Sequence, residues 1–276
     1  MKIPLLYAGN RAVFDGIVIS LLSATRYCLY PLDVYLLTMD LRDRDPKFQP
    51  LTEEQRAYLE ALCRERNSES RVRLIDVGDL YRKTLLHSPN AETGYTPYCF
   101  LRLFADCLPE LPDKLIYLDT DTLFCDDPFK LYTELVDGYE LAGVRDRYGC
   151  HFFGANYLNS GVLLLNLAEI RRTGLFRRAV DLCATQKLFL PDQTAINRLA
   201  RKKKILPRCF NEQKEARRDT VIRHFSMTIQ WIPFRTQSVK PWQVDRVHQI
   251  LKTFRFDGIL NEYLRRRPSF PCAYEA

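Results

Sequence analysis

Residues 114–124 constrain the fold most, because a short apolar run there ends abruptly in two carboxylates. Residues 115–118 are Leu-Ile-Tyr-Leu, and Asp119 and Asp121 follow directly. A run of this length predicts a buried strand, and the carboxyl ends of strands border the crevice where open α/β sheets bind ligands. Two positions apart on a strand, the two aspartates would face the same way.

Two like charges held this close cost free energy unless a cation or a shared proton compensates. Carboxylate oxygens suit hard divalent ions such as Mg²⁺ and Mn²⁺. Asp119 and Asp121 are therefore candidate metal ligands. From the pattern alone, a polar turn after a strand is an equally good interpretation.

Length and composition narrow the class of protein. The chain has 276 residues, 46% of them hydrophobic, which allows one large α/β domain or two small ones. The net charge of +7 favours anionic partners such as nucleotide phosphates, nucleic acid or acidic lipids. Nine cysteines without a CxxC pair are typical of a reducing compartment. With no secretory signal at residues 1–8 and no run of about 18 apolar residues, we expect a cytoplasmic protein.

Strand and helix patterns alternate along the chain, which predicts an α/β fold with a mostly parallel sheet. Thr52 and Gln55 have the spacing of a helix capping box. Apolar runs predict strands at 3–8, 33–39, 71–77, 115–118, 140–144 and 161–166. Helical patterns cover 16–23, a segment from Thr52, 99–108, 128–136, 167–186 and 192–203.

Two basic clusters, at 201–204 and 265–267, have two interpretations. Such runs are most often solvated surface. Alternatively they contact an acidic membrane surface, where each Lys or Arg adds about 1 kcal/mol. Aromatic residues between 254 and 274 would suit such an interfacial segment, at the inner face of the membrane. No recognised nucleic-acid module accompanies the charge, so we expect no nucleic-acid partner.

The string Asp-Thr-Asp-Thr at 119–122 also fits the DxDxT nucleophile motif of haloacid dehalogenase-type phosphatases. In that family the motif usually opens the catalytic domain, and a later lysine and acidic pair complete the site. Here three predicted strands precede the motif, and no later apolar strand ends in paired aspartates. This alternative enzyme class is therefore disfavoured.

Five separated motifs, in order and spacing from residue 3 to about 242, closely resemble glycosyltransferase family 8, the glycogenin and lipopolysaccharide galactosyl- or glucosyltransferase group. The motifs are YCFLRL at 98–103, DKLIYLDTD at 113–121, NSGVLLLNL at 159–167, DQTAIN at 192–197, and His224-Phe225 with a later Lys-Pro-Trp at 240–242. The resemblance implies a GT-A fold over 1–242, followed by a helical, basic and aromatic extension over 243–276.

The same resemblance implies a retaining, metal-dependent transfer of glucose or galactose from a UDP-sugar to a glycan or lipid-linked saccharide, as in polysaccharide biosynthesis. Mn²⁺ is the implied cofactor, with Mg²⁺ as the alternative. Two other functions stay open for this fold. One is a catalytically inactive nucleotide-sugar binding protein, and the other is a glycogenin-like protein that glucosylates itself, since the chain has 15 tyrosines.

The family motif assigns the metal ligands to Asp119, Asp121 and His224. On its own a histidine beside Phe225 would more often be structural, although imidazole with two carboxylates favours Mn²⁺ over Mg²⁺. Asp192 and Gln193 match the pair at the reacting face, where Asp192 could otherwise be a helix cap. Covalent and front-face mechanisms of retention both remain open.

The resemblance also assigns the donor-binding residues. Without it, the arginine among them would be an exposed helical charge and the lysine a lone surface residue. The set is Ala8, Asn10, Arg102, Asp119, Thr120, Asn159, Ser160, Gly161 and Lys240.

The chain departs from the family pattern in two places. Asn10 stands near a usual acidic position and Ala12 near a usual Asn, which leaves selectivity for uracil undetermined. Asn10 can still hydrogen-bond a pyrimidine edge. The segment between His224 and Lys240 is longer than usual and lacks the family's glycine, so it could form a lid or a wall of the acceptor site.

Overall fold

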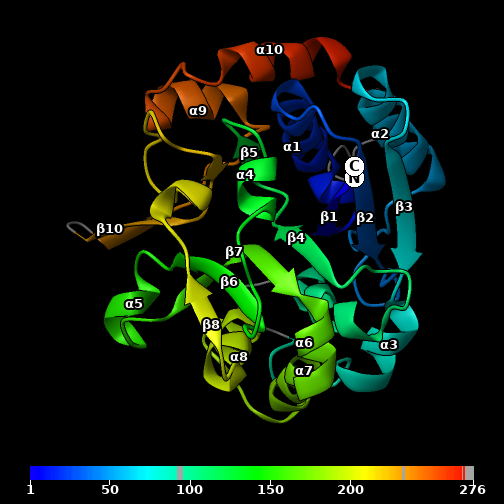
Figure 1. The fold of residues 1–276 in the computed structure, drawn as a ribbon, viewed down its shortest axis with the longest axis vertical. Coiled ribbons are helices and arrows are strands. Elements are labelled where there is room, and N and C mark those ends of the chain that lie inside the picture. The colour runs from blue at the N-terminus through cyan, green and yellow to red at the C-terminus, as the bar shows by residue number, and fades with distance from the viewer. Residues whose placement is uncertain (92–95, 232–233, 269, 271–276) are drawn as a thin grey trace.

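The computed structural model describes residues 1–91, 96–231, 234–268 and 270, and its centre is a seven-stranded sheet (Figure 1). The strand order is β3-β2-β1-β4-β7-β6-β8, and β7 alone runs opposite to its neighbours. The predicted mostly parallel sheet is therefore confirmed. The strands are β1 (Ile3–Ala8), β2 (Leu32–Thr38), β3 (Arg71–Asp76), β4 (Lys114–Leu118), β6 (Leu141–Arg145), β7 (Leu158–Asn166) and β8 (Lys203–Ile205).

Helices cover both faces of this sheet (Figure 1). On β1, Leu5 and Tyr7 join one hydrophobic cluster and Leu6 the other, because successive strand residues face opposite ways. The first cluster packs beneath α1 (Phe14–Tyr27), α2 (Glu53–Arg66), α9 (Val244–Leu251) and α10 (Asp257–Arg266). The second packs against α3 (Gly78–Thr84), the 3₁₀ helix η2 (Pro97–Cys107), α6 (Leu167–Thr173), α7 (Leu175–Thr185) and α8 (Pro191–Leu199).

Local sequence explains where several helices begin and end. The Thr52 hydroxyl accepts from the backbone N–H of Gln55 and the Gln55 side chain accepts from that of Thr52, which is the expected capping box. The predicted helix 167–186 is instead two helices, because Gly174 adopts φ 65° and ends α6 with a left-handed residue.

Two further helix predictions were too long. The helix predicted over 192–203 ends at Leu199, because the Glu140 carboxylate accepts the backbone N–H groups of Arg201 and Lys202 and the chain continues into edge strand β8. The helix predicted over 128–136 is only α4 (Phe129–Tyr132). Beyond it, the carbonyl of Glu134 accepts from the Lys114 side chain instead of from a helical N–H.

Two short sheets lie outside the central one. β5 (Thr122–Phe124) pairs with β9 (Ile222–His224), and β10 (Thr228–Trp231) pairs with β11 (Phe234–Gln237). The sequence patterns predicted none of β5, β10 and β11. A three-residue strand offers too little periodicity to recognise, and its pairing depends on a partner about 100 residues away.

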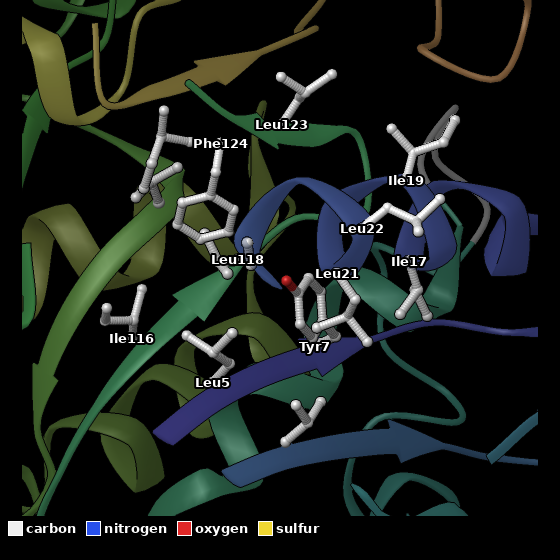
Figure 2. Packing of buried hydrophobic residues seen from close by; sticks show 14 of the residues in the cluster. Leu5, Tyr7, Ile17, Ile19, Leu21, Leu22, Ile116, Leu118, Leu123 and Phe124 are labelled. Carbon is white, nitrogen blue, oxygen red and sulfur yellow. The ribbon is translucent and has the colours of Figure 1, made fainter. Parts of the chain in front are cut away.

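A buried chain of hydroxyl groups crosses the first hydrophobic cluster. Figure 2 shows Tyr7 among the apolar side chains of α1, β4 and β5. Its hydroxyl lies 2.9 Å from that of Ser20, which lies 3.2 Å from that of Thr122. Thr122 in turn donates to the carbonyl of Asp119 at 2.8 Å. The chain therefore links β1 and α1 to the turn that carries the two aspartates.

The C-terminal helices share the first hydrophobic cluster with α1, through Val247 on α9 and Leu260 on α10. The domain boundary expected after residue 242 stays a prediction. Arg266 pairs with Glu65 and Glu262. Within the described residues, no helix combines the length and apolar character needed to cross a membrane.

Gly16 on α1 allows close contact with the aspartate-bearing turn. A Cβ at this position would lie 2.3 Å from the carbonyl oxygen of Thr120 and 2.6 Å from the Trp242 ring. We expect Gly16→Ala to lower the free energy of unfolding by about 1–3 kcal/mol through overpacking, measured by urea denaturation. Gly258→Ala on α10 is the control, because its Cβ would meet only the flexible Arg26 guanidinium. Equal effects of both substitutions would contradict this packing argument.

Candidate metal and sugar-nucleotide site

The site forms where two separate strand pairs end. β4 ends at Leu118, and the turn containing Asp119 and Asp121 leads into β5. Because Thr122 of β5 pairs with His224 of β9, the histidine lies beside this turn despite its distance in sequence. A bond from the Phe225 N–H to the Asp121 carbonyl, 2.9 Å long, holds the two segments together.

These segments bring three potential ligand side chains together. Ligand atoms of Asp119, Asp121 and His224 all lie within 4.8 Å of one another. His224 Nε2 is 3.3 Å from Asp121 Oδ1 and 3.8 Å from Asp119 Oδ2. Two carboxylates and one imidazole at this spacing fit a divalent cation such as Mn²⁺.

Gly161 on β7 gives this cluster its space. Its carbonyl accepts from the N–H of Asp119 at 2.7 Å, in the register of the β4–β7 pair. A Cβ on Gly161 would lie 2.2 Å from His224 Cε1 and 2.8 Å from Asp119 Oδ2. Any larger residue would therefore displace two of the three candidate ligands.

Arg102 is buried beside the cluster and bonds several site groups. Its guanidinium donates to Asp119 Oδ1 at 2.9 Å and to the Ser160 carbonyl at 2.5 Å, and lies 3.2 Å from Asp192 Oδ2. It also lies over the Tyr117 ring, 4.2 Å from the centroid. With 4% of its surface exposed, Arg102 is no exposed helical charge.

The segment around Arg102 also differs from the prediction. It is a 3₁₀ helix over Pro97–Cys107 and not the α-helix expected for 99–108. In a 3₁₀ helix, residues three apart eclipse each other. Arg102 thus lies over Cys99, whose carbonyl accepts from the guanidinium at 3.1 Å.

Asp192 and Gln193 lie in the first turn of α8 and are buried. Burial raises the pKa of the Asp192 carboxyl above its usual value, an effect that the charge of Arg102 opposes. Gln193 Oε1 accepts from the Ser160 N–H at 2.9 Å, and its amide nitrogen donates to Asp146 at 3.2 Å. Asp192 is not the N-cap of α8, since that position belongs to Leu190.

Asn159 and Ser160 join Gly161 in strand β7, which begins three residues before the predicted strand. Their polar side chains are bonded within the site, so the strand tolerates them. Asn159 donates to Asp146 at 2.9 Å, and the Ser160 hydroxyl donates to Gln193 at 3.2 Å.

Lys240 reaches the cluster from the segment before α9. Its ammonium lies 2.5 Å from Asp121 Oδ2, and it is therefore no lone surface lysine. Burial opposes ionisation of Asp121, but Lys240 and His224 outweigh this and hold the pKa of that carboxyl well below its usual range. A cation beside two acids is also placed to meet an anionic ligand.

The remaining predicted donor residues lie at adjacent strand ends. Ala8 ends β1, which pairs in parallel with β4 and so places Ala8 near the start of the Asp119 turn. Thr120 lies within that turn. Asn10 is buried, and its amide donates to the carbonyl of Lys47 at 3.4 Å.

Three residues of the site were missed by sequence reasoning. Tyr117 donates to Asp119 at 2.9 Å, and its position two residues earlier on the same strand face could have revealed it. Asp146 follows β6 directly, which is the same strand-end signal that identified Asp119. Asn211 lies in no motif, yet it is fully buried against His224.

Comparison with known proteins agrees with this geometry. Residues 48–245 match the family model described as glycosyl transferase family 8. Glycosyltransferase GlyA of Streptococcus pneumoniae is 35% identical over 112 residues, which are 40% of this chain and 16% of GlyA. Glucoside xylosyltransferase 2 of Mus musculus is 34% identical over 93 residues, 29% of this chain and 21% of that protein. The matched segments are thus a minor part of both relatives.

Solved structures share the fold. An active-site mutant of LgtC superposes with a TM-score of 0.69 at 17% identity, covering 95% of both chains. The galactosyltransferase LgtC in complex with donor and acceptor sugar analogs gives 0.66 at 18% identity, over 94% of this chain and 96% of that one. GlyE of Streptococcus pneumoniae gives 0.60 at 20% identity, over 97% and 64%. The chain has the GT-A fold and belongs to glycosyl transferase family 8.

Proposed function

We propose that this protein is a metal-dependent retaining glycosyltransferase that moves a hexose, glucose or galactose, from a UDP-sugar to a saccharide or lipid-linked glycan. The observation that carries the proposal is the convergence of Asp119, Asp121 and His224 from two strand pairs, with Lys240 against them. Acidic ligands for a cation beside a basic residue suit a diphosphate leaving group.

The ligand set favours Mn²⁺, with Mg²⁺ as the alternative, because imidazole binds the softer ion better. Asp119, Asp121 and His224 would hold the ion. When bound, it supplies Lewis-acid stabilisation of the charge that develops on the departing diphosphate. In this proposal Lys240 contacts the same diphosphate, and its charge offsets the negative charge that accumulates as the glycosidic bond breaks.

The donor sugar would lie against residues that the chain already holds in place. We assign its hydroxyl groups to Asn159, Ser160 and Arg102. Arg102 is fixed by bonds to Asp119 and to the Ser160 carbonyl, so little side-chain entropy is lost when the sugar binds. Ala8, Asn10 and Thr120, at neighbouring strand ends, are assigned to the nucleoside side.

Asp192 and Gln193 are assigned to the reacting face. Both retaining routes pass through oxocarbenium character at the anomeric carbon, which a carboxylate and an amide oxygen can stabilise. The amide of Gln193 is bonded at both ends, by Ser160 and Asp146, so its oxygen is held in one direction. Both covalent and front-face routes remain compatible with this arrangement.

An exposed aromatic surface borders this face and suits the acceptor saccharide. Phe153 and Phe189 are 42% and 75% exposed, with ring centroids 6.1 Å apart. The Phe153 ring also packs against that of Tyr157, with the centroids 4.9 Å apart, and the Tyr157 hydroxyl lies 2.8 Å from that of Thr194, next to Gln193. The apolar face of a sugar ring packs well on such rings.

We also propose peripheral contact of the basic C-terminus with an acidic membrane. Only basic side chains that form no ion pair within the protein would contribute their full charge to this contact. Arg266 pairs with Glu65, and Arg267 lies 3.1 Å from Asp15. In the other basic cluster, Lys204 pairs with Glu134. The charge that a lipid surface would meet is therefore smaller than the sequence suggests.

The first test is donor hydrolysis. With Mn²⁺ and a panel of UDP-glucose, UDP-galactose, UDP-N-acetylglucosamine and GDP-mannose, we expect UDP release from one UDP-hexose. Asp121→Ala should lower this rate about 100-fold or more, because an electrostatic group at the leaving phosphate is lost. Asp126→Ala removes a carboxylate of the same segment that is ion-paired with exposed Lys130, and should leave the rate unchanged.

Two outcomes of this test point elsewhere. Tight UDP binding without turnover of any donor or acceptor would favour the catalytically inactive binding protein. The departures from the family pattern at Asn10 and Ala12 motivate this alternative. A mass increase in hexose units after incubation with UDP-glucose alone, read by intact-mass spectrometry, would favour glycogenin-like self-glucosylation.

The second test uses Gly161. We expect Gly161→Ala to weaken Mn²⁺ binding at least tenfold, measured by calorimetry without nucleotide, because its Cβ would displace His224 and Asp119. Gly143→Ala on β6 is the matched control, since its Cβ would meet a methyl group of Leu163 at 2.9 Å and neither His224 nor Asp119. Normal Mn²⁺ affinity in the Gly161 variant would argue against this cluster as the metal site.

The third test concerns the acceptor. Phe189→Ala should raise KM for the saccharide acceptor by up to about tenfold, equivalent to about 1.4 kcal/mol of lost contact, while donor hydrolysis stays unchanged. Phe254→Ala is the control, because this ring is similarly exposed, at 66%, and stacks on His248 at the other end of the chain. A loss of donor hydrolysis in the Phe189 variant would contradict an acceptor role.

A further inference from the structure

Asp146 and Asn211 form, with Asn159, a buried hydrogen-bonded path that ends on His224. None of the family motifs contains Asp146 or Asn211. Asn211 has no exposed surface, Asp146 is 9% exposed and Asn159 7%. Their side chains join β6, β7 and the segment before β9, three elements that meet only in the fold. Buried amides aligned in this way have a defined polarity, because each end must face a partner of the opposite kind.

The polarity is set at the Asp146 end. Asp146 Oδ1 accepts the backbone N–H groups of Tyr148 at 3.0 Å and Gly149 at 2.6 Å. Asp146 Oδ2 receives Asn159 at 2.9 Å and Gln193 at 3.2 Å. A carboxylate only accepts hydrogen bonds, so both amides must turn their NH₂ groups toward it.

The orientation of Asn159 then fixes that of Asn211. With its nitrogen on Asp146, Asn159 presents its oxygen to the backbone N–H of Gly161 at 3.0 Å, a donor that cannot flip. The same oxygen accepts from Asn211 Nδ2 at 2.9 Å. Asn211 must therefore present its own oxygen in the opposite direction, where His224 Nδ1 lies 3.2 Å away.

The last step selects a tautomer of His224. An amide oxygen needs a donor, so Nδ1 must carry a hydrogen, and Nε2 is the nitrogen left to offer a lone pair to a metal. Nε2 is the atom that faces Asp121 and Asp119, at 3.3 and 3.8 Å. A histidine that ligates a metal through one nitrogen needs this kind of partner on the other.

We propose that Asp146 and Asn211 are positioning residues that hold His224 in the tautomer and orientation required to ligate the metal through Nε2. The inference rests on the proposed metal-dependent function but concerns ligand geometry, not turnover. Asp146 also holds Gln193, so it couples the metal side of the site to the reacting face. Among the described residues, the Asn211 side chain is hydrogen-bonded to Asn159 and His224 and not to Gln193, so it gives the cleaner test.

The experiment compares two substitutions of Asn211. Asn211→Leu removes the acceptor for Nδ1 and the donor to Asn159. Asn211→Asp also loses that donor, but its carboxylate still accepts from Nδ1. If the hydrogen-bonded path sets the tautomer, Asn211→Leu should bind Mn²⁺ about 10–100-fold more weakly than the parent, measured by calorimetry without nucleotide. The Mn²⁺ affinity of Asn211→Asp should stay within about threefold of the parent.

A spectroscopic readout separates positioning from general damage. In the Zn²⁺-loaded protein, the ring ¹⁵N signals of His224 should show a protonated Nδ1 in the parent and in Asn211→Asp. Asp146→Asn, which turns a donor toward the two amides, should weaken Mn²⁺ binding although residue 146 is no ligand. Asp76→Asn is its control, because Asp76 also accepts a backbone N–H two residues on, that of Gly78, at 2.7 Å.

Mn²⁺ affinity within twofold of the parent in Asn211→Leu, or equal losses in the Leu and Asp variants, would overturn the inference. Suppose that the parent binds Mn²⁺ and that Asn211→Leu and Asn211→Asp differ as expected, but that the parent hydrolyses no donor sugar. This result would support the positioning role of the hydrogen-bonded path and overturn the proposed transferase function. A parent that binds no Mn²⁺ would overturn both.

Discussion

The buried guanidinium of Arg102 is the interaction on which the site depends, because it compensates carboxylates that would otherwise repel one another. It bonds Asp119 from the β4 turn, Asp192 from α8 and the carbonyl of Ser160 on β7. Three elements distant in sequence are thus held by one planar cation whose donors point in fixed directions. Removing a buried partner of this kind leaves unpaired charge and is typically far more costly than breaking a surface ion pair.

The hydroxyl chain beneath the site complements this arrangement. Tyr7, Ser20 and Thr122 connect the core of β1 and α1 to the carbonyl of Asp119. Burial raises the pKa of Tyr7 well above its usual value, so this hydroxyl stays protonated and available as a donor. The turn that carries Asp119 and Asp121 is therefore fixed by the core through Thr122 and by Arg102 through Asp119.

The sequence predicted the elements whose own residues carry the signal, and missed those that depend on distant partners. The apolar runs identified six of the seven central strands, and the edge strand β8 escaped because it begins with Lys203 and Lys204. The strand-end signal identified Asp119 and Asp121, although both lie in the turn between β4 and β5 and not on a strand. His224 came only from the family resemblance, since its contact with them depends on pairing between β5 and β9.

In the proposed function, the amide path through Asn159 and Asn211 gives the sugar site and the metal site a shared residue. Asn159 is assigned to a sugar hydroxyl, yet its oxygen also fixes Asn211 and through it His224. A donor sugar that bonds Asn159 without turning the Asn159 amide strengthens the existing orientation of the path. A donor sugar that draws the Asn159 nitrogen away from Asp146 weakens the hold on His224 as a metal ligand. Coupling between two binding sites is reciprocal, so metal binding would in turn favour donor sugars that leave the Asn159 amide in place. The proposed site would therefore discriminate between sugars partly through the orientation of His224.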